Sequence, residues 1–268
     1  MLSLLSFDGL RPIWSAELIE SLRSRHAAGR TLSPPDYPHS AEDLAVALRR
    51  WAPGLSQMRD VAVWSSLTPW VETLLLAHGA ASVTTVDFNE PVLPPPGAGG
   101  TRLQTLPTSA LPAEYARGRR FDLILFFSGV EHDGLGRYGD PINPHGDYAA
   151  MAELRALLRP ESGLLLLATP LGARDDVHFP WHRIYGPRRL PRLLRGFDWL
   201  GNVWDGQLTE RGSPGLPLPR NISQAEVRAI GRRGTKWIRR TKPEAMPSQY
   251  QPVLALRAAA GASAQAAD

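Results

Sequence analysis

Residues 121–147 read FDLILFFSGVEHDGLGRYGDPINPHGD, and this stretch changes character near its middle. Residues 121–127 are apolar apart from Asp122, which predicts a strand covered on both faces. The remainder mixes glycine and proline with ionisable side chains, which predicts a loop rather than a packed helix. In an open α/β sheet, ligands bind beyond the carboxyl ends of the strands. This loop is therefore the first candidate for a functional site.

Strands and helices alternate on both sides of this stretch. The predicted strands are residues 61–65, 82–87, 102–106, 121–127, 164–169, 197–204 and 251–256. Helical spacing and helix-stop signals predict helices at residues 70–78, 148–158 and 190–195. Such alternation is typical of an α/β fold, with a doubly wound, mostly parallel sheet and helices on both faces.

The chain divides into three predicted regions. Residues 1–57 form an N-terminal helical extension, with helices at 15–26 and 40–51 separated by the irregular segment LSPPDYP. Residues 58–257 form the α/β domain, in which residues 205–222 are a Pro/Gly-rich surface segment. Residues 258–268 are an alanine-rich tail that we expect to be disordered.

Composition limits the class of protein. With 268 residues, 43% of them hydrophobic, the chain can bury one large core. It contains no cysteine, which excludes disulfides, thiolate metal sites and a cysteine nucleophile, and fits a cytoplasmic location. No apolar run approaches the roughly 18 residues of a membrane span. The start MLSLLSFDGL has no basic region before its apolar residues, so we expect no secretory signal.

The net charge of +4 comes with basic residues that concentrate late in the chain. They could form a solvated surface, or an anion-binding rim for an acidic substrate. No RNA or DNA motif accompanies them, so a nucleic-acid partner is not expected. These residues are Arg183, Arg188, Arg189, Arg192, Arg195, Arg228, Arg232, Arg233, Lys236, Arg239, Arg240 and Lys242.

The end of the second predicted strand carries an acidic residue, Asp87. An acidic residue at this place, about 20 residues after the first loop, accepts ribose hydroxyls in nucleotide-type folds. The first loop departs from those folds, because Ser65 and Ser66 stand where glycine is expected and no glycine follows before Gly79. Asp87 therefore also remains open to an ordinary role as a strand-terminal turn residue.

Three segments together resemble one family. They are WVETLLLAHGAASVTTVDFNEP at 70–91, residues 121–147, and HRIYGPRRL at 182–190. The family is the Caenorhabditis-type domain of unknown function, which also occurs in bacteria and algae. Its pattern pairs a Pro-Trp-Val-Glu helix start, here residues 69–72, with a Val-Glu-His-x-Gly-Leu-Gly-Arg-Tyr-Gly-Asp-Pro loop, here residues 130–141. The similarity covers about residues 60–257.

This family is in turn similar to class I S-adenosylmethionine-dependent methyltransferases. The resemblance implies a Rossmann-like methyltransferase fold with a seven-stranded, mostly parallel sheet whose last strand is antiparallel. It also implies S-adenosylmethionine as the cofactor and a small-molecule or sugar-like acceptor. The residues that it places against the cofactor are Ser65, Ser66, Trp70, Asp87, Phe88 and Ser128.

The loop after residue 127 is then expected to face the methyl group and the acceptor. His132 is the candidate base, because the unperturbed pKa of histidine is near neutrality, and Glu131 could orient it or contact the cofactor. Alternatively, His132 caps a helix or ties the loop together. The expected substrate contacts, which could instead cross-link the loops, are Arg137, Tyr138, His178, His182, Arg183 and Tyr185.

Other interpretations stay open. His132, His145, His178 and His182 could hold a metal, but none of their spacings matches a tight metal motif, so no metal site is predicted. A methyltransferase-like domain that binds without catalysis is a second hypothesis, which the glycine-poor first loop favours. A different transferase or nucleotide-sugar enzyme on the same sheet is a third, because fold does not fix function. The oligomeric state is not predicted.

Overall fold

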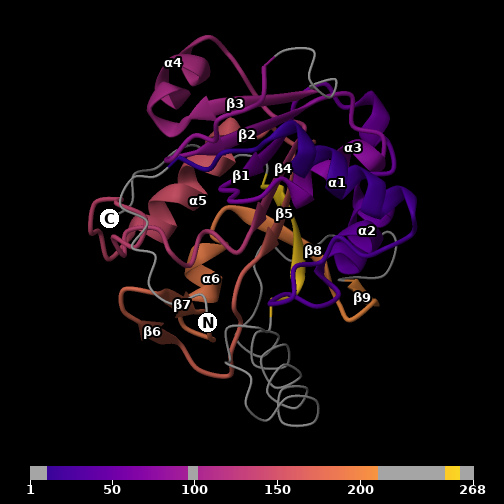
Figure 1. Cartoon of the computed structure of the whole chain (residues 1–268). Coiled ribbons are helices and arrows are strands. Elements are labelled where there is room, and N and C mark those ends of the chain that lie inside the picture. Colours follow the sequence, from indigo (N-terminus) through magenta and orange to yellow (C-terminus); the bar gives the residue numbers. More distant parts are fainter. Residues whose placement is uncertain (1–10, 96–101, 211–250, 260–268) are drawn as a thin grey trace.

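The computed structural model describes residues 11–95, 102–210 and 251–259. Its main sheet has eight strands in the order β3-β2-β1-β4-β5-β10-β8-β9 (Figure 1). Their bounds are β1 (Val61–Trp64), β2 (Val83–Asp87), β3 (Leu103–Pro107), β4 (Leu123–Phe127), β5 (Leu164–Ala168), β8 (Phe197–Trp204), β9 (Gln207–Glu210) and β10 (Val253–Ala258). A separate hairpin consists of β6 (Asp176–His178) and β7 (His182–Ile184).

Strand direction confirms the predicted fold class. β3, β2, β1, β4 and β5 are mutually parallel, whereas β10 runs antiparallel to both β5 and β8. All seven predicted strands are present, and the last of them in sequence is the antiparallel one. The fold is thus a mixed, mostly parallel α/β arrangement.

An eighth strand departs from the prediction. β9 lies inside residues 205–222, which we expected to be irregular, and it pairs antiparallel with β8. Asp205 and Gly206 form the turn with φ of 49° and 72°, the left-handed conformation that tight hairpins require. The sequence QLTE has too little apolar alternation to reveal the strand. Residues 211–222 lie outside the described part of the chain.

Helices cover both faces of the sheet. They are α1 (Ala16–Ala27), α2 (Ser40–Trp51), α3 (Trp70–Ala77), α4 (Leu111–Ala116), α5 (Gly146–Leu157) and α6 (Leu190–Leu193), with short 3-10 turns at Leu55–Gln57 and Thr108–Ala110. Leu123 and Leu125 of β4 pack in the core beneath α1, α2 and α3, whereas Ile124 and Phe126 pack with α4, α5 and α6. Because β4 is buried on both faces, its apolar run is continuous.

The N-terminal helices share the core of the sheet. Leu44 and Leu48 of α2 are buried in the same cluster as strands β1, β4 and β10. The carboxylate of Asp43 accepts hydrogen bonds from the backbone N–H groups of Asp205 (3.0 Å) and Gly206 (2.7 Å), which ties α2 to the β8–β9 turn. The described part of residues 1–57 is therefore packed onto the α/β core.

No helix within the described ranges is long and apolar enough to cross a membrane. The basic residues between 228 and 242, and most of the expected tail at 258–268, lie outside those ranges. Ala258 itself is the last residue of β10.

Candidate functional site

Two serines make left-handed turns at neighbouring strand ends. Ser65 follows β1 with a φ of 59°, and Ser128 follows β4, the neighbour of β1 in the sheet, with a φ of 50°. This region of backbone space favours glycine, because a Cβ is crowded there. The first loop thus makes a turn of the kind that glycine would allow, although it contains none. The missing glycine does not prevent the turn.

The first loop is joined to the tip of β2. The backbone N–H of Ser66 donates to Oδ2 of Asp87 over 2.9 Å, and the N–H of Asn89 donates to Oδ1 over 2.7 Å. Burial raises the pKa of Asp87 above its ordinary value. Phe88, the next residue, is 54% exposed. Asn89 Nδ2 also donates to the carbonyl of Tyr138, which brings the loop after β4 to the same place.

Glu72, in the Pro-Trp-Val-Glu segment, is hydrogen-bonded to the first loop. Its carboxyl group is fully buried and accepts hydrogen bonds from Ser66 Oγ (3.2 Å) and Thr85 Oγ1 (2.8 Å). Burial raises the pKa of Glu72 to about 7. Trp70, two residues earlier, packs edge-on against Phe127 with ring centroids 5.0 Å apart. Glu72 is not among the predicted site residues, although it stands in the Pro-Trp-Val-Glu motif.

Glu131 lies at the junction of four segments. Its side chain is 1% exposed; Oε1 accepts from Ser128 Oγ (2.7 Å) and Oε2 from Thr169 Oγ1 (3.1 Å). Ser128 Oγ is also hydrogen-bonded to Tyr37 (2.9 Å) and accepts from Gln251 Nε2 (3.2 Å). Burial raises the pKa of Glu131 to about 7. Tyr37 and Gln251 were not predicted as site residues.

The position of Tyr37 explains the irregular segment between α1 and α2. The ring of Tyr37 packs edge-on against Phe127 at 5.3 Å, and its hydroxyl reaches Ser128. The N-terminal region therefore closes over the end of β4. A signal was present in the sequence, because an aromatic residue stands inside the proline-rich LSPPDYP segment.

His132 is buried next to Glu131. Its Nδ1 lies 2.5 Å from the carbonyl oxygen of Trp181; since a carbonyl only accepts, Nδ1 carries the proton and Nε2 does not. Nε2 is 3.7 Å from Oε1 of Glu131. Burial, followed by the charge of Arg137, lowers the pKa of His132 to about 3. Desolvation thus disfavours the protonated form of His132, an effect that the unperturbed pKa of histidine does not include.

The two predicted loops meet at Arg137. Its guanidinium lies 5.1 Å from the ring centroids of both Tyr138 and Trp181, and Nη1 donates to the Trp181 carbonyl over 3.2 Å. The β6–β7 hairpin also brings the rings of His178 and His182 into a stack at 5.1 Å. Burial, followed by His178, lowers the pKa of His182.

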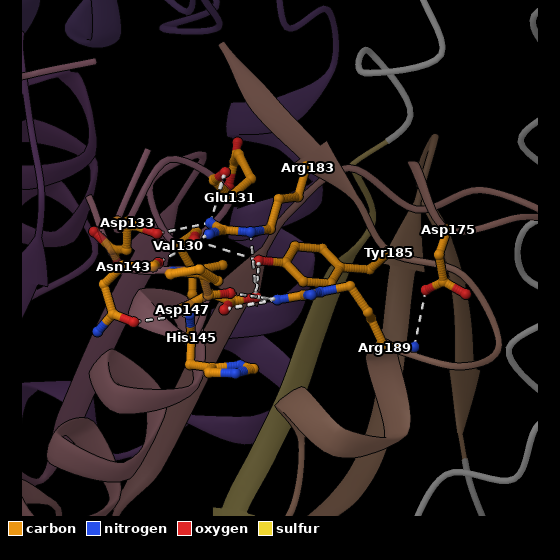
Figure 2. A network of polar contacts seen from close by, with 12 residues as sticks. Val130, Glu131, Asp133, Asn143, His145, Asp147, Asp175, Arg183, Tyr185 and Arg189 are labelled. Atoms are coloured by element: carbon orange, nitrogen blue, oxygen red, sulfur yellow. Dashed lines mark hydrogen bonds and ion pairs between the residues drawn. The ribbon is translucent and has the colours of Figure 1, made fainter. Parts of the chain in front are cut away.

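Arg183 and Tyr185, which we expected to contact a substrate, point into the protein (Figure 2). Arg183 is 2% exposed, and its Nη1 donates to the carbonyl of Asp133 over 2.7 Å. Tyr185 is fully buried, and its hydroxyl donates to Asp147 Oδ2 over 3.0 Å. Both side chains lack a free surface for a substrate, so their contacts correct that expectation. They cross-link the loop after β4.

Asp147 is the centre of this network. Its buried carboxylate accepts two hydrogen bonds from Nη2 of Arg189, at 2.9 and 2.7 Å, and lies 3.8 Å from Nε of Arg183 (Figure 2). Arg183 in turn contacts the backbone of the segment that carries Glu131, whose carbonyl accepts from the Arg183 N–H over 3.0 Å. The network fixes the backbone on which the candidate catalytic pair is mounted.

Within the described residues, no group of three or more His, Cys, Asp or Glu side chains is arranged to hold a metal. His145, one of the histidines weighed as a ligand, stacks on Tyr148 with ring centroids 5.9 Å apart.

Solved structures similar to this one include several that are described as methyltransferases. The Burkholderia thailandensis 1,6-didemethyltoxoflavin-N1-methyltransferase, with bound 1,6-didemethyltoxoflavin and S-adenosylhomocysteine, is 20% identical with a TM-score of 0.44; 91% of this chain and 89% of that chain are covered. The N-methyltransferase NodS from Bradyrhizobium japonicum WM9, in complex with S-adenosylhomocysteine, is 14% identical with a TM-score of 0.44, over 89% and 96% of the two chains. At these identities the likeness concerns the fold alone.

The sequence itself identifies the family. Residues 58–211 match the family described as "Caenorhabditis protein of unknown function, DUF268". The match covers more than half of the chain, so the protein belongs to this family. A search of curated proteins gives no match.

Proposed function

We propose that the protein is an S-adenosylmethionine-dependent methyltransferase that acts on a small-molecule or sugar-like acceptor. One observation carries this proposal: the Ser66–Asp87 contact and the Ser128–Glu131 contact lie at the ends of the neighbouring strands β2, β1 and β4. Carboxyl ends of parallel strands form the ligand-binding edge of such a sheet. Asp87 at the tip of β2 could bind a ribose, and the buried Glu131 after β4 could lie near a reactive methyl group. S-adenosylmethionine contains both groups.

The proposed cofactor contacts start at Asp87. Each of its oxygens accepts one backbone N–H, and a carboxylate oxygen has a second lone pair that can accept from a ribose hydroxyl. The exposed ring of Phe88 would pack against the adenine. Ser65 and Ser66 would face the amino-acid part, with Trp70 and Ser128 completing the wall.

The proposed chemistry uses the Glu131–His132 pair. S-adenosylmethionine, when bound, supplies the methyl group to a nucleophile. The acceptor must lose a proton as the new bond forms, and a base with a pKa near the working pH is best matched to take it. The pKa of Glu131, at about 7, meets this condition, so we assign the proton to Glu131, with Ser128 as the hydroxyl next to it. Neutral His132 would position the acceptor through its unprotonated Nε2.

The acceptor would lie against the surface that the two loops share. Arg137, Tyr138 and His182 are half-buried there, and His178 is exposed. Aromatic faces and hydrogen-bonding groups suit a sugar-like or other small ring. Arg183 and Tyr185 have no part in this contact.

A binding domain without catalysis is the second candidate. The observation that favours it is the burial of Glu131, because both of its oxygens already accept hydrogen bonds from Ser128 and Thr169. Such a domain would bind S-adenosylmethionine without turning it over. Incubation with methyl-labelled S-adenosylmethionine and pooled sugars, phenols and carboxylic acids separates the two, because only the enzyme transfers label.

Calorimetric titration tests whether the protein binds S-adenosylmethionine, which both candidate functions require. We expect S-adenosylmethionine and S-adenosylhomocysteine to bind one to one, and a ligand at a hundred times its Kd to stabilise the fold by about 2.7 kcal/mol. NADH and UDP-glucose serve as the comparison ligands for the other transferase hypothesis. Binding of a comparison ligand alone would reject the methyltransferase.

A further inference from the structure

The arginines around the site differ in whether a carboxylate neutralises them. Arg189 pairs with Asp147 at 2.7 Å, and Arg183 lies 3.8 Å from the same carboxylate. Arg137, in the loop after β4, has no carboxylate within ion-pair distance in residues 11–95, 102–210 and 251–259. In those ranges the charge of Arg137 thus lacks a direct ion pair, whereas Arg183 and Arg189 both have one.

The head group of Arg137 is held in one place. Tyr138 and Trp181 lie on it at 5.1 Å each, and Nη1 is fixed by the carbonyl of Trp181. The guanidinium has five N–H donors, and among the described residues the hydrogen bond that it donates, to the carbonyl of Trp181, comes from Nη1. Because packing already holds the forked guanidinium in place, it loses little further conformational entropy when it binds a partner. It is therefore preorganised to bind a planar or tetrahedral anion.

Arg137 lies close enough to the candidate catalytic pair, Glu131 and His132, for its positive charge to act on it. Nη1 lies 3.4 Å from Nδ1 of His132, and the charge of Arg137 contributes to the lowered pKa of both His132 and His182. The Trp181 ring, half exposed, offers an apolar surface beside the guanidinium. The place therefore combines a fixed cation with an aromatic surface within reach of Glu131 and His132.

We propose that the methyl acceptor carries an anionic group, a carboxylate or a phosphate, and that Arg137 binds this group. This inference rests on the proposed methyltransferase function, and it narrows the acceptor to acidic small molecules. The fork of Arg137 donates to two oxygens of the anion, while Trp181 and Tyr138 cover the ring or chain that bears it. The reacting atom of the acceptor then lies on the side of His132 and Glu131.

Three small aromatic probes test the proposal: benzoate, phenyl phosphate and the neutral benzamide, which has nearly the shape of benzoate. Each is titrated into the full-length protein, with and without S-adenosylhomocysteine, and binding is followed by calorimetry. We expect at least one anionic probe to bind about 10-fold more tightly than benzamide, because charge-assisted forks are the stronger hydrogen bonds. A preference for phenyl phosphate assigns the phosphate, and a preference for benzoate assigns the carboxylate.

Substitutions test whether Arg137 causes the preference for anionic probes. Arg137→Gln should abolish the preference for the anionic probe, and Arg137→Lys should retain only part of it, because lysine keeps the charge and loses the fork. Arg188→Gln is the matched control, since its exposed side chain lies in the same loop cluster and takes no part in the proposed site. Thermal unfolding establishes that each variant is folded.

The outcomes separate this proposal from the function on which it rests. Equal binding of benzamide and the anions, an unchanged preference in Arg137→Gln, or no binding of any probe at tens of millimolar would overturn the anionic subsite. If the anions bind through Arg137 while S-adenosylhomocysteine does not bind, the subsite stands and the methyltransferase proposal fails.

Discussion

The backbone N–H of Ser66 and the carboxylate of Asp87, 21 residues apart in sequence, are joined by a hydrogen bond of 2.9 Å. The contact connects the loop after β1 to the tip of β2, the two places where an adenosyl group is held in sheets of this type. The first loop keeps this connection without glycine, since Ser65 adopts a left-handed backbone instead.

The first prediction concerns Asp87→Asn. The amide retains one acceptor oxygen and presents an NH₂ where an acceptor stood, so we expect the affinity for S-adenosylhomocysteine to fall about 10-fold or more. Calorimetry measures it. Asp205→Asn is the control, because Asp205 is exposed in the β8–β9 turn and asparagine tolerates its left-handed backbone. Unchanged affinity in Asp87→Asn would remove Asp87 from the proposed cofactor site.

The second prediction is a pH dependence of stability that Glu72 causes. Its pKa is about 7 in the folded protein and about 4.5 when unfolded, so the folded state holds the proton more tightly. Its contribution to stability is therefore complete below the unfolded pKa and is lost as the pH rises through 7. Relative to Glu72→Gln, the wild type should lose on the order of 2 kcal/mol of unfolding free energy between about pH 5 and about pH 8.

Urea unfolding at several pH values measures this difference, and taking the difference cancels other titrating groups such as His132. Glu20→Gln is the control, because Glu20 is exposed on α1. If the curves of wild type and Glu72→Gln stay parallel, Glu72 does not hold a proton in the folded protein at neutral pH.

The third prediction concerns the buried network of Asp147. Asp147→Asn leaves Arg183 and Arg189 without their counter-charge, and breaking a buried pair costs about 3–5 kcal/mol. Tyr185→Phe removes only the hydroxyl that donates to Asp147, for which about 1 kcal/mol is expected. Urea unfolding at one pH ranks the two. Equal losses would mean that the ion pairs contribute no more than the tyrosine hydroxyl.

The fourth prediction compares two glycines of the loop after β4. Gly134 and Gly139 both have left-handed backbones, with φ of 77° and 83°. A Cβ at Gly134 would come within 2.1 Å of the Asn143 carbonyl oxygen, whereas a Cβ at Gly139 would meet nothing within 4 Å. Gly139→Ala should therefore cost only the conformational strain, about 1–2 kcal/mol. Gly134→Ala should destabilise by clearly more, since the loop backbone must move.

Thermal unfolding of the two alanine variants provides the comparison. A shift of the backbone at residue 134 would first weaken the hydrogen bond from the Gly134 N–H to Asp140 Oδ2. Similar melting temperatures would show that the loop around Gly134 yields without cost.

The sequence predicts the central strands β4 and β5 because they are continuous apolar runs. β4 and β5 are buried along their whole length, and no polar side chain interrupts the run that packs. The hairpin of β6 and β7 could not be predicted in the same way, because Asp176–His178 is exposed and carries no strand pattern. Exposed strands of a surface hairpin lack the pattern of apolar residues by which a strand is recognised in a sequence.

Candidate site residues such as Glu131 and Arg137 can be proposed from the sequence because they stand in a local motif. Tyr37 was missed because its contact with Ser128 spans 91 residues and depends on how the N-terminal segment crosses the sheet. Burial separates Arg183, which is enclosed, from His182, which is partly open, although the two are adjacent. Protonation was also beyond the sequence, because the low pKa of His132 and the high pKa of Glu131 both follow from desolvation.

A crystal structure of the protein with S-adenosylhomocysteine tests the central claim most directly. The account predicts ribose hydroxyls within hydrogen-bond distance of Asp87, an adenine ring against Phe88, and a sulfur that points toward Ser128 and Glu131. Ligand bound at another surface, or crystals grown at saturating ligand in which side chains fill the space between residues 65–66, 87 and 131, would contradict it.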